Sequence, residues 1–236
     1  WYRWSNKTEH IVIEEGITGI GSEAFAGFVK VLSVNIPYTV KKIKRNSFEN
    51  NYRLREIQIP NEVISIGDKA FAGCHGLKNL SLPSKLNYVG SFEFCKNIKS
   101  ISLPDSTKDT ADGMFTGCEM LTSVKLPRKL KAIKAYDFAD CRKLTKLNIP
   151  VTVKVVYMSA FAGSGLKKIV LPSNVQKIRN GNDGQKVFEY IKGIGYPTKN
   201  LRVIEIHSKK VKSIQKNSFS GLSSKVVIKV PKSKKK

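Results

Sequence analysis

The four cysteines are the residues of this chain best equipped for chemistry, since a thiolate can hold a metal, pair with a second thiol or act as a nucleophile. They are Cys74, Cys95, Cys118 and Cys141, which stand 21, 23 and 23 residues apart. No two of them form the CxxC pair that is typical of zinc sites, so we expect no metal and no other cofactor. Cysteines of neighbouring repeats could approach within disulfide range. We expect instead a row of buried thiols that pack as small apolar side chains.

The three histidines give no sign of an enzyme. His10, His75 and His207 are far apart in the sequence and occupy different positions of the repeat described below. A catalytic dyad or a metal site needs such groups to converge. The segment 180–184 faintly resembles a calcium loop, but it has one carboxylate and lacks the terminal glutamate, so we interpret it as a turn. The sequence therefore predicts a protein without catalytic or metal-binding residues.

The charge of the chain is strongly positive. It has 42 basic and 18 acidic residues, which gives a formal net charge of +24, and only eight of the basic residues are arginine. A field of this size attracts anionic partners, and the attraction weakens with salt. Lysine suits diffuse attraction to anionic glycan, lipid or acidic protein, whereas paired hydrogen bonds to phosphates or bases favour arginine. The alternative is that a surface repeated many times simply repeats its charges.

The basic residues recur at two fixed positions of a repeat. The position after a valine-type residue holds Lys41, Lys108, Lys131, Lys154 and Lys212. The position after the leading leucine-type residue of a unit holds Arg55, Lys78, Lys99, Lys167, Lys168 and Arg202. Beside it we expect a floor of small polar side chains: Asn79, Ser81, Ser100, Ser102, Ser123 and Asn148. A flat floor with basic margins would suit an extended ligand, and the alternative is an ordinary solvated sheet.

A repeat of about 23 residues positions these side chains. Nine of the eleven phenylalanines fall in one column, at Phe25, Phe48, Phe71, Phe94, Phe115, Phe138, Phe161, Phe188 and Phe219. Eight of the nine prolines also keep step, at Pro37, Pro60, Pro83, Pro104, Pro127, Pro150, Pro172 and Pro231. A fixed period of this length is the signature of a solenoid, in which each unit buries its apolar side against its neighbours.

Each unit contains a short strand, an apolar pair and an aromatic turn. The segment 80–82 alternates apolar and polar residues, as a half-buried strand does, and Pro83 ends it because proline has no N–H for the ladder. Two apolar residues three apart follow, as in Val63 and Ile66, and then a turn that places Phe71 inside. Stacking in parallel at about 4.8 Å would align each position into a column.

The pattern LxxLxLPxxVxxIGxxAFxGC, which residues 77–83 and 63–74 display, resembles the BspA-type leucine-rich repeat over about residues 8–231. The resemblance implies an α/β solenoid of about nine repeats, stacked right-handedly. It also implies a parallel sheet on one face and turns or 3-10 segments on the other. It further implies a bacterial protein that is secreted or lies on the cell surface, and a binding module rather than an enzyme. No site residues transfer, because the motif is structural throughout.

Departures from the repeat are candidate functional features. Two residues are missing, which we place between Phe94 and Cys95. Thr107 and Thr110 replace the apolar pair of one unit, so that coil should be weak. The largest break, 179–200, predicts an exposed loop whose contact aromatics would be Tyr190 and Tyr196, although a tolerated insertion is the alternative. His207 stands where other units have proline.

The domain organisation that we expect is an N-terminal segment 1–7, a single repeat domain 8–231 and a basic tail 232–236. The chain has no initiator methionine, no signal peptide and no apolar run of about 20 residues, so we expect a piece of a longer protein. We predict a non-catalytic module that attaches to a host or microbial polyanion, glycan or acidic protein. The alternatives are a nucleic-acid-binding protein and a stalk without a ligand. The end coils lack neighbours, so copies of the chain could associate end to end or side by side.

Overall fold

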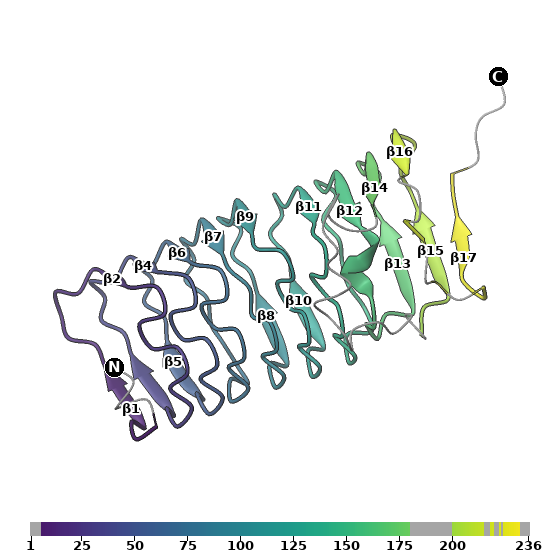
Figure 1. Ribbon diagram of the computed structural model, residues 1–236. Helices are drawn as coiled ribbons and strands as arrows, with labels where there is room; N and C mark the ends of the chain where they lie inside the picture. The colour runs from purple at the N-terminus through teal and green to yellow at the C-terminus, as the bar shows by residue number, and fades with distance from the viewer. Residues whose placement is uncertain (1–5, 180–199, 215–217, 220–221, 223, 232–236) are drawn as a thin grey trace.

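The computed structural model describes residues 6–179, 200–214, 218–219, 222 and 224–231. These residues form one elongated stack of coils that runs from β1 at one end to β17 at the other (Figure 1). Each coil passes along two faces of the stack, and all pairings between coils are parallel. Parallel pairing fixes the register, so equivalent residues of successive coils lie side by side.

The first face carries the strands that the sequence predicts. Residues of adjacent strands pair position by position, as Val34 does with Ile57 and Ile101 with Val124. An isolated bridge joins Asn79 to Ser100. The strands are β1 His10–Val12, β3 Ser33–Asn35, β5 Glu56–Gln58, β8 Ser100–Ser102, β10 Ser123–Lys125, β13 Lys168–Leu171, β15 Val203–Ile206 and β17 Val227–Lys229.

The second face carries shorter strands, which the sequence analysis did not anticipate. The strands are β2 Gly19–Ile20, β4 Lys42–Ile43, β6 Ser65–Ile66, β7 Tyr88–Val89, β9 Asp109–Thr110, β11 Ala132–Ile133, β12 Val155–Tyr157, β14 Lys177–Arg179 and β16 Ser213–Ile214. They form one ladder from β2 to β9 and a second from β11 to β16. The second residue of the expected apolar pairs, such as Ile43 and Ile66, points inward and is buried.

A stack of aromatic rings runs through the interior. Its members are Phe25, Phe48, Phe71, Phe92, Phe115, Phe138 and Phe161, whose successive ring centroids lie 5.4–6.2 Å apart. All but Phe25 are fully buried. Each ring therefore packs between the rings of the two neighbouring coils, and the stack ties the coils together along the axis.

The prediction that Phe94 belongs to this stack is wrong. Phe92 occupies the place between Phe71 and Phe115, while Phe94 is 41% exposed and has a positive φ of 58°. The two missing residues consequently lie between Val89 and Phe92, because Phe92 precedes Cys95 by the same three residues as Phe71 precedes Cys74. This coil is therefore shortened before its buried ring. The 23-residue spacing from Phe71, used alone, pointed to Phe94 instead of Phe92.

Two details of the expected architecture, the α/β class and the nine repeats, are not confirmed. The described residues contain a single helical segment, the 3-10 turn Met158–Phe161, so the structure is a β-solenoid and not an α/β fold. The expected turns are present, at residues 22–27, 45–50, 68–73, 112–117 and 135–140, and the short strands of the second face precede them. The stack has about eight turns, and nine repeats are not confirmed. Phe188, counted for one of the nine, lies outside the described residues.

Candidate ligand-binding surface

The lysine row (Lys41, Lys108, Lys131, Lys154 and Lys212) lies on the second face, and all five side chains are exposed. Backbone hydrogen bonds hold two parts of the row in register, since Lys108 N–H donates to Asn87 O at 2.9 Å and Lys154 N–H donates to Lys131 O at 2.8 Å, whereas the ladder is interrupted between the coils of Lys108 and Lys131. Ile64 and Asn87 separate Lys41 from Lys108, and Gln176 separates Lys154 from Lys212. Only Lys108, Lys131 and Lys154 therefore occupy successive coils.

The amines of the lysine row have no acidic partner among the described residues. The nearby acids are engaged elsewhere: Asp105 accepts from Arg128 Nε at 2.7 Å, and Asp109 pairs with Lys134 Nζ at 3.0 Å. The hydrogen bonds from Arg128 lower the pKa of Asp105, so this carboxylate remains ionised and occupied. The row can consequently offer its charge to a ligand without first breaking an ion pair.

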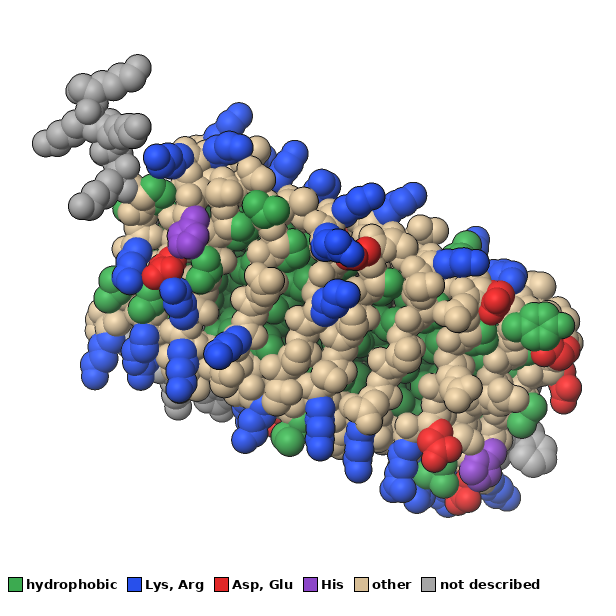
Figure 2. Space-filling model, turned by 180° about the vertical axis from the view of Figure 1, so that it is seen from behind, with side chains coloured by type: hydrophobic (Ala, Val, Ile, Leu, Met, Phe, Trp, Pro, Cys, Tyr) green, Lys and Arg blue, Asp and Glu red, His purple; other side chains and the backbone are tan. Residues whose placement is uncertain are grey.

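The basic margin (Arg55, Lys78, Lys99, Lys167, Lys168 and Arg202) lies on or beside the first face and is exposed. It falls into three parts. Lys99 N–H donates to Lys78 O at 3.3 Å, and Arg202 N–H donates to Lys167 O at 2.9 Å, whereas Arg55 borders the coil before Lys78. The Lys168 amine is already held, because its Nζ lies 2.8 Å from Glu205 Oε2. Figure 2 shows basic side chains along both long edges of the stack, with acidic side chains gathered toward the N-terminal end.

The polar floor expected on the first face is present. Asn79, Ser81, Ser100, Ser102, Ser123 and Asn148 are all exposed. Ser100 pairs with both Asn79 and Ser123, so these side chains stand next to one another on the sheet. The floor is short and uncharged, and Lys99 lies beside it. Tyr190 and Tyr196, the contact aromatics expected from the insertion, lie outside the described residues.

The four cysteines are free and buried, as predicted. Each thiol donates to the carbonyl oxygen of a phenylalanine in the preceding coil, at 3.0–3.2 Å. Burial raises the pKa of every one of these thiols, and it brings that of Cys95 to about 12. The row therefore satisfies buried carbonyl groups and does not supply reactive thiolates.

The histidines do not converge on a site. His10 Nδ1 lies 2.7 Å from Ser33 Oγ, His75 stacks on Tyr52, and the His207 ring lies 3.4 Å from Glu205. Among the described residues, no group of three or more histidines, cysteines and acids is arranged to hold a metal. No helix in the described part of the chain has the length and apolar character needed to span a bilayer.

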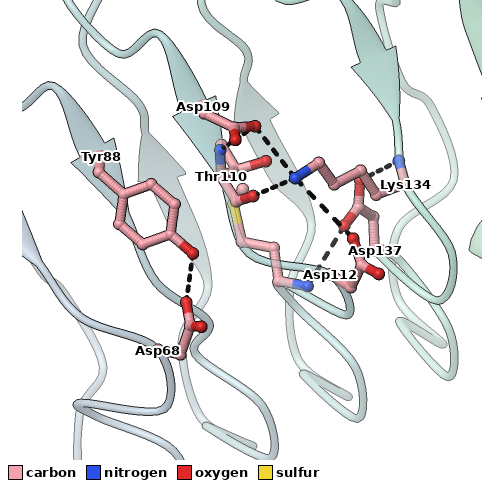
Figure 3. A network of polar contacts seen from close by, with 8 residues as sticks. Asp68, Tyr88, Asp109, Thr110, Asp112, Lys134 and Asp137 are labelled. Carbon is pink, nitrogen blue, oxygen red and sulfur yellow. Dashed lines mark hydrogen bonds and ion pairs between the residues drawn. The ribbon is translucent and has the colours of Figure 1, made fainter. Parts of the chain in front are cut away.

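A polar network that the sequence analysis missed lies between β9 and β11 (Figure 3). Lys134 Nζ reaches Asp109, Asp112 and the carbonyl oxygen of Thr110. Asp137 is buried beneath, and it accepts hydrogen bonds from the N–H groups of Lys134 at 2.7 Å and Met114 at 3.3 Å. Burial raises the pKa of Asp137 to about 8 despite these bonds.

The sequence held one signal for this network. Asp137 precedes the stacked Phe138, at a position that holds alanine, serine or methionine before the other buried rings of the stack. A buried aspartate at this position needs hydrogen-bond donors from neighbouring groups, because a buried carboxylate without them is costly. The network joins two coils at the point where the ladder of the second face is interrupted, so its role is structural.

Comparisons with known proteins place the chain among repeat proteins. A model of the BspA type leucine rich repeat region, in six copies, matches residues 1–95 and 90–194. A leucine-rich repeat protein from Bacteroides ovatus is 27% identical, with a TM-score of 0.63 over 94% of this chain and 69% of its own.

Two further solved structures share the fold. The T. pallidum leucine rich repeat protein is 23% identical, with a TM-score of 0.63 over 89% of this chain and 88% of its own. A leucine rich cell surface protein from Faecalibacterium prausnitzii is 20% identical, with a TM-score of 0.52 over 92% and 62%. No curated protein matches the chain.

Proposed function

Because this chain belongs to the BspA-type leucine-rich repeat family, we propose that it is a non-catalytic binding module that holds an extended anionic ligand along its lysine row. We place it on the surface of a bacterium or outside the cell. The cell-surface description of the Faecalibacterium prausnitzii relative supports this location. The partner is an anionic glycan or an acidic protein, and the module binds it without chemical change.

The observation that carries the proposal is the group Lys108, Lys131 and Lys154. These exposed amines stand on successive coils and have no ion pair with any described residue. Paired strands lie about 4.8 Å apart, so the like charges of Lys131 and Lys154, which stand on paired coils, repel one another, and Lys108 adds a third charge on the coil across the interruption of the ladder. An anionic polymer that places a negative group near each coil relieves this repulsion, and a rigid stack presents the amines without a large ordering cost.

The first face offers a second contact area for the same ligand class. The polar floor can hydrogen-bond to a ligand, and Lys78 and Lys99 beside it supply charge. Arg55, Lys167 and Arg202 extend the basic margin toward the ends of the stack. Lys168 contributes less, because Glu205 already neutralises its amine.

The test of the lysine row is a charge reversal, Lys108→Glu, Lys131→Glu and Lys154→Glu together. We expect the triple variant to elute from a column of heparin-like glycan at clearly lower salt than the unchanged protein, because three contacts become repulsive. Its folding should persist, since the three side chains lie in solvent. Circular dichroism and the thermal midpoint check that the stack is intact.

The matched control is Lys7→Glu, Lys30→Glu and Lys143→Glu, which removes the same charge from exposed positions outside the lysine row and the basic margin. The proposal requires the control to elute at distinctly higher salt than the row variant. If both variants elute at the same lowered salt concentration, only the net charge of the protein determines its retention. Stronger retention on single-stranded DNA than on glycan would favour a nucleic-acid partner, and no retention of the unchanged protein at about 0.15 M salt would favour a stalk.

A further inference from the structure

A hollow of about 520 Å³ opens on the first face between β10 and β15. Three successive coils line it: residues 146–149 and Val151 from the first, Val170, Pro172 and Ser173 from the second, and His207 from the third. Its volume lies within the range of about 300–1,000 Å³ that is usual for small-molecule pockets. We call it the His207 pocket.

The strand ladder is open at the base of the His207 pocket. β10 pairs only with β8, and the next ladder begins at β13. The coil between them should contribute a strand at 146–148, but residues 145–149 make no backbone hydrogen bond with another described residue. Unpaired backbone N–H and C=O groups need a partner, which water or a ligand can supply. The pocket therefore contains backbone donors and acceptors that, in the other coils, form hydrogen bonds within the sheet.

One wall of the pocket is apolar at positions that most other coils fill with polar side chains, although Val12 takes the position equivalent to Val170 in β1. Val170 takes the outward position that holds Asn35, Gln58, Ser102 or Lys125 in other strands of this face. Val151, which follows Pro150, is 56% exposed and corresponds to Ser84, Asp105 and Arg128 in other coils. With Pro172 these side chains form a small aliphatic surface beside polar Asn148 and Ser173.

The charged groups at the mouth favour an anion. Lys146 is exposed and has no ion pair with a described residue. His207 replaces the proline of the repeat, and its N–H donates to Leu171 O at 2.9 Å, a bond that proline could not make. Its ring lies 3.4 Å from Glu205, whose carboxylate Lys168 and Lys229 also hold, at 2.8 and 3.3 Å. Glu205 is thus balanced by its own cations, and Lys146 is left for a ligand.

These features select among small anionic ligands. A nucleotide base would require an aromatic or arginine side chain to stack on, and the one aromatic ring of the lining, His207, is held by Glu205 at 3.4 Å. A purely aliphatic acid would leave the open backbone groups unpaired. A sugar ring has an aliphatic C–H face and hydroxyl groups around its edge, which match the valine and proline wall and the polar groups opposite. A carboxylate on the ring would meet Lys146.

We propose that the His207 pocket binds a hexose ring that carries a carboxylate, either as the free sugar or as one unit of an acidic polysaccharide. Lys146 pairs with the carboxylate, Val151, Val170 and Pro172 pack against the ring, and His207, Asn148 and Ser173 hydrogen-bond to its hydroxyls. The inference goes beyond the lysine row, because it uses other residues on the other face and can hold even if the row binds nothing.

Calorimetry at about 0.15 M salt with two tetrasaccharides tests this assignment. One alternates glucuronate with N-acetylglucosamine, and the other is the neutral tetramer of N-acetylglucosamine. We expect the acidic probe to bind more than about tenfold more tightly, since a hydrogen bond to a charged group is at stake. In NMR spectra, the backbone amide chemical shifts that change on binding should be concentrated at residues 145–151 and 170–173. Free glucuronate is a third probe that distinguishes a site for the single sugar from one that needs the chain.

Two sets of variants decide the outcome. Lys146→Gln and His207→Ala should each weaken binding of the acidic tetrasaccharide, by about tenfold for Lys146→Gln, whereas Lys108→Gln, Lys131→Gln and Lys154→Gln together should leave it within about twofold. Equal affinity for the acidic and neutral probes, no binding of either, or unchanged affinity in Lys146→Gln would overturn the proposal. Loss of binding in the row variant alone would assign the glycan to the lysine row instead.

Discussion

At the scale of single residues, two phenylalanines near each other in sequence have opposite roles. Phe92 is fully buried and lies 6.1 Å, centroid to centroid, from both Phe71 and Phe115. Phe94 is 41% exposed. We expect Phe92→Ala to lower the free energy of unfolding by about 3–5 kcal/mol, because it opens a cavity between two rings. Urea denaturation of both alanine variants measures the difference.

Phe94→Ala is the matched control for that experiment. It removes the same ring from the same coil and keeps the backbone hydrogen bond that the Phe94 N–H donates to Thr116 O. Its cost should stay below about 1 kcal/mol, as at most surface positions. A larger loss from Phe94→Ala than from Phe92→Ala would show that the ring stack described here passes through the wrong residue.

The residue scale also shows how far the sequence could lead. The cysteine row, the polar floor and the lysine row were predictable, because a parallel stack carries a sequence period directly into a spatial column. Phe92 was missed because Phe94 keeps the 23-residue distance from Phe71, whereas the distance to Cys95 would have identified the right ring. Asp137 was missed because its position is occupied by small or apolar residues elsewhere, and only the structure shows the N–H groups that hold it.

At the scale of elements, the second face has a seam between β9 and β11, where its ladder is interrupted. Thr107 and Thr110 replace apolar residues beside this seam, and each is only 1% exposed. The Thr107 hydroxyl has no hydrogen-bond partner. An unpaired buried hydroxyl costs free energy, so we expect Thr107→Val to raise the free energy of unfolding by about 1 kcal/mol. Urea denaturation of the variant checks this.

Thr116→Val makes the same chemical change as Thr107→Val, but we expect it to lower the free energy of unfolding. Thr116 is 5% exposed, and its hydroxyl donates a hydrogen bond to Tyr136 O at 2.8 Å. Its loss leaves a carbonyl group without that donor, which should lower the free energy of unfolding by about 1 kcal/mol. If both variants shift stability in the same direction, the unpaired hydroxyl is not what weakens this seam.

Elements also mark the limit of sequence reasoning about sites. The strands of the first face were visible as alternating triplets, but the strands of the second face are often two residues long and depend on pairing with their neighbours. The His207 pocket was out of reach for a related reason. The triplet Leu147–Ile149 alternates like every other strand, yet the structure leaves it outside the ladder. A missing hydrogen bond between coils leaves no trace in the sequence of one coil.

At the scale of the whole molecule, a net charge of +24 on an elongated stack favours association with anions and opposes folding through self-repulsion. Salt screens that repulsion, so the thermal midpoint should rise as sodium chloride increases from about 0.02 to 0.3 M. A gain of about 1 kcal/mol corresponds to about 2–4 °C at this chain length. The Lys108→Glu, Lys131→Glu and Lys154→Glu variant carries less repulsion and should show a smaller rise.

A bound polyanion should change the sign of this salt dependence. At low salt, a heparin-like glycan at about 100 times its dissociation constant would stabilise the folded state by about 2.7 kcal/mol, and added salt would remove that gain by weakening binding. The midpoint should therefore rise with salt in the protein alone and fall with salt in the complex. Differential scanning fluorimetry of both samples over one salt series measures the two slopes. A midpoint that falls with salt in the protein alone would mean that surface ion pairs such as Arg128–Asp105 outweigh the excess positive charge.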